Sequence, residues 1–351
     1  LTLGLASSAV VERGGTLGAI LDLLKLDDAE VYIKDRDITG DVLLQGDRVK
    51  FCGLGATGSA ADDDLEHTCI VTGRLIISGS DVTLEGLHFK HASEWTDGAT
   101  EAPMISFTSG GGSSNTKLTL KNCTFEMTGS HADGRFFCGL GSGGGVQSIE
   151  GCVIKNFTSW MLLDATTESG TPSVKLDSFV LDACRFENCM GSIAVRGQQA
   201  DPNGSVSFTN NDFVFGSNGQ HALFWDMVEA NNTLRVYATG NTVTGAVKTD
   251  NRGFLQAWSK HDLDWELMFK DNTVSGFIYG LQLAISSGFK NPDYTSDRHL
   301  IRSEAGKFTN VDYGMSLNYP WDSGTFAPDN SARFPAQPTH SFADGLTVVA
   351  N

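Results

Sequence analysis

The 351-residue sequence has no long apolar run, few basic side chains and no CxxC pair of cysteines. No stretch reaches the roughly 18 uncharged apolar residues that a membrane-spanning helix needs, so we expect no membrane insertion. The 25 Lys and Arg are outnumbered by 42 Asp and Glu, which gives a net charge of −17. Because proteins bind duplex nucleic acid by replacing its counterions with basic side chains, this balance excludes nucleic acid as an expected partner.

The seven cysteines lack the spacing of a disulfide-rich domain or a zinc site. We expect free thiols, which favour folding in a reducing cytoplasm. The eight histidines show no metal-binding spacing, and we interpret them as ordinary surface or turn residues. Neither a GxSxG motif nor a P-loop is present. We therefore predict no metal site and no cofactor.

Short apolar segments recur along the chain at an elastic period near 31 residues. Each segment has alternating apolar residues, a turn-forming residue and a final apolar anchor. The anchors are Phe89, Phe125, Ile154, Phe186, Phe213, Val243, Val274 and, more weakly, Phe308, with separations of 36, 29, 32, 27, 30, 31 and 34. A further weak copy, VKFCGLG, begins at Val49. Alternation with period two favours strands, and the elasticity favours coils in which the strands are fixed while the loops vary.

Two further columns align with the anchors and predict identical turns stacked on one another. Two positions before the anchors stand Leu87, Cys123, Cys152, Cys184, Asn211, Asn241, Asn272 and Gly306. We expect these cysteines to pack on one another and the asparagines to form a hydrogen-bonded ladder. The preceding column is rich in residues that tolerate a left-handed backbone, namely Gly86, Asn122, Gly151, Ala183, Asn210, Gly240, Asp271 and Ala305.

This pattern resembles the right-handed parallel β-helix superfamily, the pectate-lyase-like fold of pectin-degrading enzymes, phage tailspikes and some bacterial surface proteins. The resemblance covers roughly residues 31 to 320. It implies an all-β, single-stranded right-handed parallel β-helix of about nine coils. The resemblance is specific for architecture and unspecific for activity.

The two ends of the chain depart from the repeat, and both can cover the strand edges that a β-helix exposes. Residues 1–30 form an expected cap segment, in which Thr16 to Lys25 has apolar residues at helical spacing. Residues 31–317 form the expected β-helix. Residues 318–351 contain four of the eight prolines and form an expected extended arm, which wraps the last coil or crosses to a neighbouring subunit.

A second strand follows each anchor, and its alignment gives the candidate site. By pleat alternation, two columns should face outward: Leu162, Ala194, Phe224, Gln256, Gln282 and, two residues later, Asp164, Arg196, Asp226, Trp258, Ala284. Acid, base, acid and indole therefore stand in one row. The candidate ligand-binding residues are Asp164, Arg196, Asp226, Gln256, Trp258 and Gln282.

Three interpretations of this row remain open. Arg196 can bridge Asp164 and Asp226 in a purely structural ion-pair ladder. Alternatively, Trp258 can stack on a sugar ring while the polar side chains bind hydroxyl groups. Hydrolysis is the third, because two strand spacings put the Asp backbones about 9.6 Å apart, near the upper end for an inverting glycosidase. Against it, a guanidinium between two carboxylates favours the charged form of both, whereas a general acid must hold its proton.

The acidic side chains concentrate near the start of the repeat, where residues 27 to 85 hold 13 acids and 5 bases. This excess favours solubility of that end or electrostatic orientation of a partner. Within it, the run Asp62, Asp63 and Asp64 lies in an Ala/Gly/Asp-rich loop. We interpret the run as solvated surface, with a calcium site as the alternative.

A polygalacturonase-like enzyme would show Asn-Thr-Asp, paired aspartates, Gly-His-Gly and Arg-x-Lys, and this set is absent. We therefore predict no catalytic residues. The leading expectation is a bacteriophage spike, a homotrimer assembled in the host cytoplasm with other virion proteins. Its side face would bind a host polysaccharide or receptor. The alternatives are a β-helical polysaccharide lyase or glycosidase and a bacterial surface adhesin.

Overall fold

The structure is a computed structural model, and it describes about two thirds of the chain. The described residues are 8–11, 17–91, 104–107, 117–128, 137–138, 145–157, 161–164, 175–189, 193–196, 199–216, 221–227, 233–246, 253–259, 264–286, 300–304, 307–311, 313–321, 331–334, 340–341 and 347–350. They group into two compact units, Leu1–Ser159 with Ala183–Arg185, and Trp160–Asp182 with Phe186–Asn351. Both units consist of strands that contribute in turn to three sheets, here called A, B and C.

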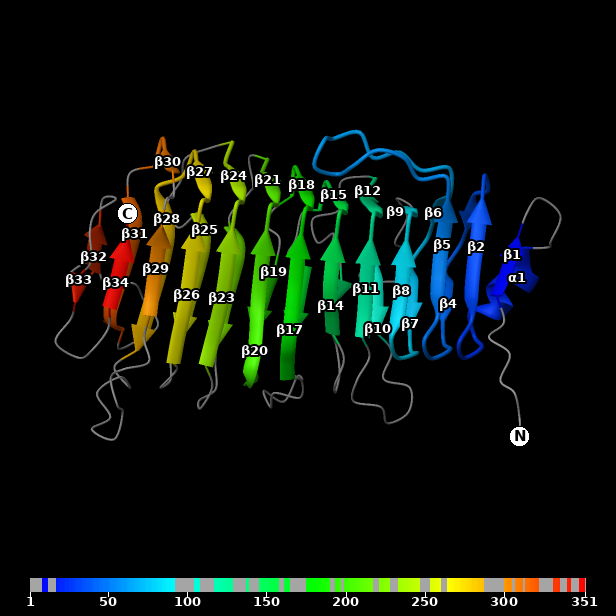
Figure 1. Cartoon of the computed structure of the whole chain (residues 1–351), viewed down its shortest axis with the longest axis horizontal. Helices are drawn as coiled ribbons and strands as arrows, with labels where there is room; N and C mark the ends of the chain where they lie inside the picture. Colours follow the sequence, from blue (N-terminus) through cyan, green and yellow to red (C-terminus); the bar gives the residue numbers. More distant parts are fainter. Residues whose placement is uncertain are drawn as a thin grey trace. The chain divides into compact units, whose positions relative to one another are not determined.

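In the first unit, successive coils stack their strands in parallel (Figure 1). Sheet A contains β1 (Ser8–Val11), β2 (Glu30–Lys34), β5 (Lys50–Leu54), β8 (Val82–Glu85), β11 (Lys117–Lys121) and β14 (Gly145–Glu150). Sheet B contains β3 (Ile38–Thr39), β6 (Ile70–Thr72), β9 (His88–His91), β12 (Thr124–Met127) and β15 (Val153–Lys155). Sheet C contains β4 (Val42–Leu44), β7 (Leu75–Ile77), β10 (Ile105–Phe107) and β13 (Phe137–Cys138).

The second unit repeats this order. Sheet A contains β17 (Lys175–Asp182), β20 (Gln199–Thr209), β23 (Thr233–Thr239), β26 (Asp264–Lys270), β29 (Leu300–Glu304), β33 (His340–Ser341) and β34 (Thr347–Ala350). Sheet B contains β21 (Asp212–Val214), β24 (Thr242–Thr244), β27 (Thr273–Ser275) and β30 (Lys307–Thr309). Sheet C contains β16 (Met161–Asp164), β19 (Ile193–Arg196), β22 (His221–Met227), β25 (Gly253–Ser259), β28 (Tyr279–Ser286), β31 (Tyr313–Trp321) and β32 (Ser331–Phe334).

The expected fold class is confirmed, because the strands form the stacked parallel sheets of a β-helix. The coil number differs from nine, since sheet B has ten strands among the described residues, of which β18 (Arg185–Glu187) is one. The coil of β2, β3 and β4 lies almost wholly within the expected β-helix of residues 31–317, but no predicted anchor belongs to it. Its anchor is Ile38, the register partner of Val71, and Arg36 rather than Cys or Asn stands two positions before it. No helix in the described ranges has the length and apolar character needed to cross a membrane.

The predicted N-terminal helix is present as α1 (Leu17–Leu23). The carbonyl of Leu24, just after the helix, accepts hydrogen bonds from the amides of Gln45 and Gly46 in the first coil, at 3.1 and 3.2 Å. Strand β1 was not predicted, and it extends sheet A by pairing in parallel with β2. Helix and strand together thus cover the first coil.

The tail after residue 317 contributes strands to the last coil of the second unit. β31 continues to Trp321, β32 pairs with it antiparallel, and β34 pairs in parallel with β29. β33 pairs antiparallel with β34. The described part of the tail therefore wraps its own chain.

The anchor column forms the core beside sheet B, as expected from its spacing. In the first unit Phe89, Phe125 and Ile154 are successive register partners. In the second unit the same holds for Phe213, Val243, Val274 and Phe308. The rings of Phe89 and Phe125 stack with centroids 5.0 Å apart, and both side chains are fully buried. The anchors therefore fix which coil pairs with which.

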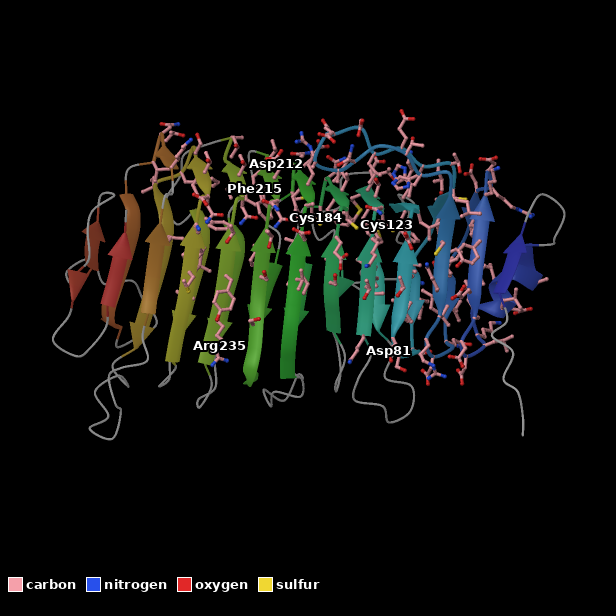
Figure 2. All side chains as sticks on the ribbon, viewed as in Figure 1. Asp81, Cys123, Cys184, Asp212, Phe215 and Arg235 are labelled. Carbon is pink, nitrogen blue, oxygen red and sulfur yellow. The ribbon has the colours of Figure 1, made fainter. Side chains whose placement is uncertain are left out.

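The cysteine column of the first unit is a buried stack of free thiols. The amide of Cys123 lies 3.4 Å from Sγ of Cys152, and the amide of Cys152 lies 3.4 Å from Sγ of Cys184. Burial raises the pKa of Cys123 and of Cys152 well above its usual range. Figure 2 shows Cys123 and Cys184 along one line of turns. The cysteines are packing residues, as predicted.

The asparagine column of the second unit is the predicted ladder. The amide of Asn211 donates to Oδ1 of Asn241 at 3.0 Å, and the amide of Asn241 donates to Oδ1 of Asn272 at 3.0 Å. Each Nδ2 also donates to a backbone carbonyl, as Asn241 does to Phe208 at 3.0 Å. Because all three side chains are buried, these bonds satisfy groups that water cannot reach.

The column before the ladder has the expected left-handed backbone. Asn122, Ala183, Asn210 and Asp271 have φ between 48° and 55°, although they carry a Cβ. Gly86, Gly151 and Gly240 adopt positive φ in the same column. A left-handed residue at each turn reverses the chain within one step, so each coil leaves sheet A and enters sheet B in the same way.

Replacing Asn241 by Ala should destabilise the protein, since it removes the hydrogen bonds that its buried side chain makes with the amide of Asn211 and the carbonyl of Phe208. We expect a loss of about 3 kcal/mol in unfolding free energy, measured by denaturant titration. Thr242→Ala, an exposed change one position away, is the control and should stay within about 0.5 kcal/mol. Equal losses for the two variants would contradict the ladder's role.

The stacked thiols should resist alkylation in the native protein, because they are buried and their pKa values are raised. Mass spectrometry after iodoacetamide treatment should find Cys123 and Cys152 unmodified at pH 8 and modified after guanidinium unfolding. Rapid native labelling of either thiol, or a disulfide joining them, would contradict the stacked coil.

Candidate functional site

The row proposed from the sequence lies in register on sheet C of the second unit. Asp164 of β16 pairs with Arg196 of β19, and Arg196 pairs with Asp226 of β22. Asp226 then pairs with Trp258 of β25, which pairs with Ala284 of β28. The backbone thus brings all four charged and aromatic residues into one line across consecutive strands. Their side chains lie outside the described part of the structure.

The second column is aligned in the same way. Leu162, Ala194, Phe224, Gln256 and Gln282 are successive register partners. The residues just before Gln256 and Gln282 belong to the core, because Leu255 and Leu281 are each 1% exposed.

Register also extends both columns into the tail, which the sequence interpretation missed. Gln282 pairs with Ser316 and Ala284 with Asn318 of β31. On the antiparallel strand β32, Arg333 pairs with Ser316 and Ser331 with Asn318. The motif Met315-Ser316-Leu317-Asn318 repeats the pattern Leu281-Gln282-Leu283-Ala284 and was the available signal. The polar row therefore continues over the last coil.

A second group of polar side chains lies on the first unit and includes His67 and His88. The sequence analysis interpreted these histidines as ordinary surface or turn residues. His67 Nε2 lies 2.9 Å from Oγ1 of Thr124, and His88 Nε2 lies 3.0 Å from Oε2 of Glu126. The two imidazole centroids are 5.8 Å apart. Burial lowers the pKa of His67, although the nearby Gly86 backbone opposes the change. Burial, reinforced by Lys90, lowers the pKa of His88 to about 4.

That interpretation of the histidines is therefore wrong for His67 and His88, because both rings are largely buried. No local signal could have shown it. The contacts join residues 57 and 38 positions apart, and they depend on how coils stack. His67 lies in a loop without periodicity, whereas His88 belongs to an alternating strand.

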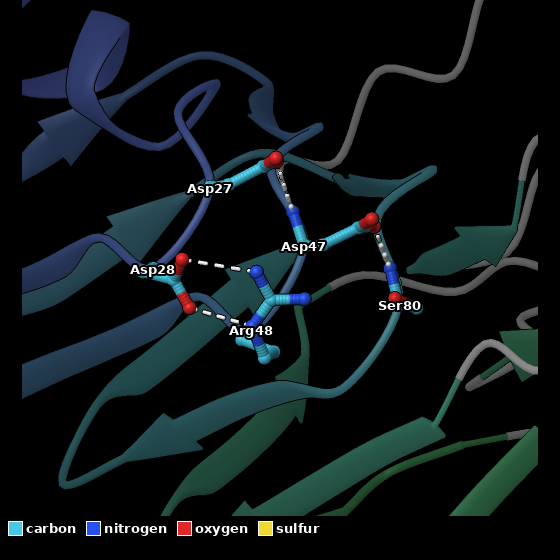
Figure 3. Close-up of polar contacts among 5 residues, drawn as sticks. All are labelled: Asp27, Asp28, Asp47, Arg48 and Ser80. Carbon is cyan, nitrogen blue, oxygen red and sulfur yellow. Dashed lines mark hydrogen bonds and ion pairs between the residues drawn. The ribbon is translucent and has the colours of Figure 1, made fainter. Parts of the chain in front are cut away.

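The acidic side chains of the first coils are used structurally (Figure 3). Asp27 accepts a hydrogen bond from the amide of Asp47 at 2.9 Å, and Asp47 accepts one from the amide of Ser80 at 2.8 Å. Hydrogen bonds from Ser80 lower the pKa of Asp47. The Arg48 guanidinium beside Asp28 lowers the pKa of that carboxyl in the same way. Much of the acidic excess thus ties one coil to the next.

The aspartate run is likewise engaged within the protein. Asp64 accepts a hydrogen bond from the amide of Ser59 at 2.6 Å, and Asp63 forms an ion pair with Arg185 at 3.3 Å. Among the described residues, no group of three or more His, Cys, Asp or Glu side chains could hold a metal ion. The alternative of a calcium site at this run therefore has no geometric support.

The fold makes the chain a parallel β-helix protein. No protein-family model and no curated protein matches its sequence. Among solved structures it is similar to a deglycosylated pectin methylesterase from Aspergillus niger, with 12% identity and a TM-score of 0.44. That similarity covers 88% of this chain and 91% of the esterase chain. A likeness at this level concerns the fold alone.

Proposed function

We propose that the chain is an attachment protein of a virion spike that binds host cell-surface polysaccharide along sheet C of its second unit. The observation that carries the proposal is the register of Asp164, Arg196, Asp226 and Trp258 on four consecutive strands. Each residue type can bind sugar. Carboxylates and guanidinium groups bind hydroxyls, and an indole offers a large flat apolar face.

The length of the row favours a polymer over a small molecule. From Asp164 on β16 to Asn318 on β31 the register crosses five strand spacings, about 24 Å at ~4.8 Å each. Gln256, Gln282 and Ser316 run parallel to this line in the neighbouring column. Regularly repeated hydroxyl-binding groups along a straight face suit an extended chain of sugars.

The virion setting rests on the type of fold and on the thiols. The six cysteines whose side chains are described are free and buried, which suits folding in a reducing host cytoplasm before release. A β-helix is a rigid support for an exposed binding face. The inference from fold to virion is by analogy with tailspikes.

A polysaccharide lyase or glycosidase is the second candidate, and one observation favours it. Asp164 and Asp226 lie on β16 and β22, two strands apart with Arg196 between them, which sets their backbones about 9.6 Å apart. That spacing is at the upper end for an inverting pair. Arg196 argues against hydrolysis, since a cation between two carboxylates opposes the protonated form that a general acid needs.

Substitutions in the row separate binding from catalysis and from a purely structural ladder. Trp258→Ala should weaken binding of a host polysaccharide at least about tenfold, equivalent to ~1.4 kcal/mol, through loss of stacking area. Tyr32→Ala, an aromatic change on sheet A of the first unit, is the matched control and should leave binding unchanged. Binding is measured by calorimetry against a panel of envelope polysaccharides, with release of reducing or unsaturated ends measured in parallel.

Each alternative predicts a different result in the same panel. Cleavage by the wild type that is lost in Asp164→Asn and Asp226→Asn would replace the attachment proposal with the enzyme. A small loss of stability in Arg196→Ala, with no polysaccharide bound by the wild type, would leave only the ion-pair ladder.

The spike proposal also predicts a homotrimer. The tail carries Phe326, Phe334 and Phe342, which can be buried against a neighbouring subunit around a threefold axis. Light scattering of the full chain at micromolar concentration should give three times the mass of one chain. A monomer at that concentration would contradict the trimer. It would not contradict polysaccharide binding, which the Trp258→Ala experiment tests separately.

A further inference from the structure

One loop of the first unit lies across the turns of several coils. Residues 55–69, here called the strap, leave β5 and return to β6 after crossing the line of turns between sheets A and B (Figure 1). The strap has backbone hydrogen bonds of its own and a buried residue at its far end. Thr57 and Glu66 exchange both backbone hydrogen bonds at 3.0 and 2.8 Å, and Ala60 at its far end is 2% exposed.

Two side-chain contacts hold the strap on coils that are distant in sequence. Asp63 pairs with Arg185 of β18 at 3.3 Å, with 52% and 19% of the two side chains exposed. His67 bonds Thr124 of β12 at 2.9 Å, where Thr124 is 4% exposed. The ion pair is the more solvated contact, so it contributes little to docking. The histidine contact is the buried one.

Burial favours the neutral form of His67 in this contact, although the Gly86 backbone acts in the opposite direction. Its Nδ1 is buried and has no hydrogen-bond partner among the described residues. A neutral ring can leave a lone pair on Nδ1 at small cost while Nε2 bonds Thr124. Protonation would place an N–H and a positive charge at that buried atom. Docking and protonation of His67 therefore oppose each other.

The charges near the strap act on His88 in both directions. The rings of His67 and His88 have centroids 5.8 Å apart, and Glu126 of β12 lies 3.0 Å from His88 and 3.8 Å from Lys90 of β9. On β15, Lys155 is the register partner of Glu126. Lys90 and a protonated His67 oppose a positive charge on His88, whereas Glu126 favours it. Release of the strap would carry His67 into water.

We propose that the strap is a pH-gated cover, docked on the turns of the first unit while His67 and His88 are neutral and released when they are protonated. Release uncovers the turn that carries Thr124. The face beneath the strap therefore becomes accessible only in acid. This inference is independent of the polysaccharide site, which lies in the other unit.

Linkage gives the direction and the pH window. Both histidines have a lower pKa in the docked state than the usual value of about 6.5. The undocked state therefore binds more protons, and docking weakens as pH falls below about 6.5, by up to tenfold per pH unit for each ring. Between pH 7.5 and 5.0, His67 alone can weaken docking up to about 30-fold.

Amide hydrogen exchange of the strap tests the proposal. Protection factors, which remove the intrinsic pH dependence of exchange, are measured for peptides within residues 55–69 at pH 7.5 and 5.0. The wild type should lose protection at pH 5.0. His67→Gln, which keeps a neutral hydrogen-bonding side chain, should lose less, and the double change with His88→Gln should lose none.

Arg185→Met is the matched control, because it removes the Asp63 ion pair without removing a titrating group. It should lower strap protection only slightly, and by the same factor at both pH values. The amides of the Asn211 to Asn272 ladder are the internal reference, and their protection shows that each variant is folded. Unchanged wild-type protection between the two pH values would overturn the proposal, as would an equal loss in the double variant.

Discussion

The structure depends on one constraint: each coil must stack on the next in strict register, because its turn atoms hydrogen-bond the turn of its neighbour. In the first coils, aspartates accept from amides 33 residues later, as Asp41 does from Arg74 and Asp47 from Ser80. In the second unit the direction is reversed, and Asn241 accepts from the amide of Asn211, 30 residues earlier. Either bond forms only when equivalent positions face each other.

This constraint explains why outward columns can carry function. Parallel pairing alone permits a strand to slip, and a slip of one residue would turn every side chain to the other face. The buried ladders and the stacked anchors oppose such slips at every coil. Residues 30 positions apart are therefore held side by side, and the row from Asp164 to Trp258 is a consequence of this spacing. The loops between strands are free to vary, and one of them provides the strap.

The sequence was sufficient to predict structure wherever a column of equivalent residues repeats from coil to coil. The anchors, the Cys and Asn columns, the left-handed positions, α1 and the register of the row all follow from period and residue type. The sequence was insufficient to predict a contact that occurs at a single place and does not repeat between coils. The contact between His67 and Thr124 joins a loop to a strand 57 residues away, and neither segment has a sequence pattern that predicts the contact. The anchor of the coil formed by β2 to β4 was missed because Arg36 stands two positions before it, where most later coils have Cys or Asn. The tail strands were missed because Pro320 lies within β31 and further prolines lie close to β32 and β33.

We propose that sheet C of the second unit is a polysaccharide-binding face. The most direct measurement is a crystal structure of the protein soaked or grown with host-polysaccharide fragments of increasing length. We expect sugar density across β22, β25 and β28, with one ring stacked on Trp258 and longer fragments extending toward Asn318. Fragments that bind reproducibly at another face, with this row unoccupied at saturating concentration, would contradict it.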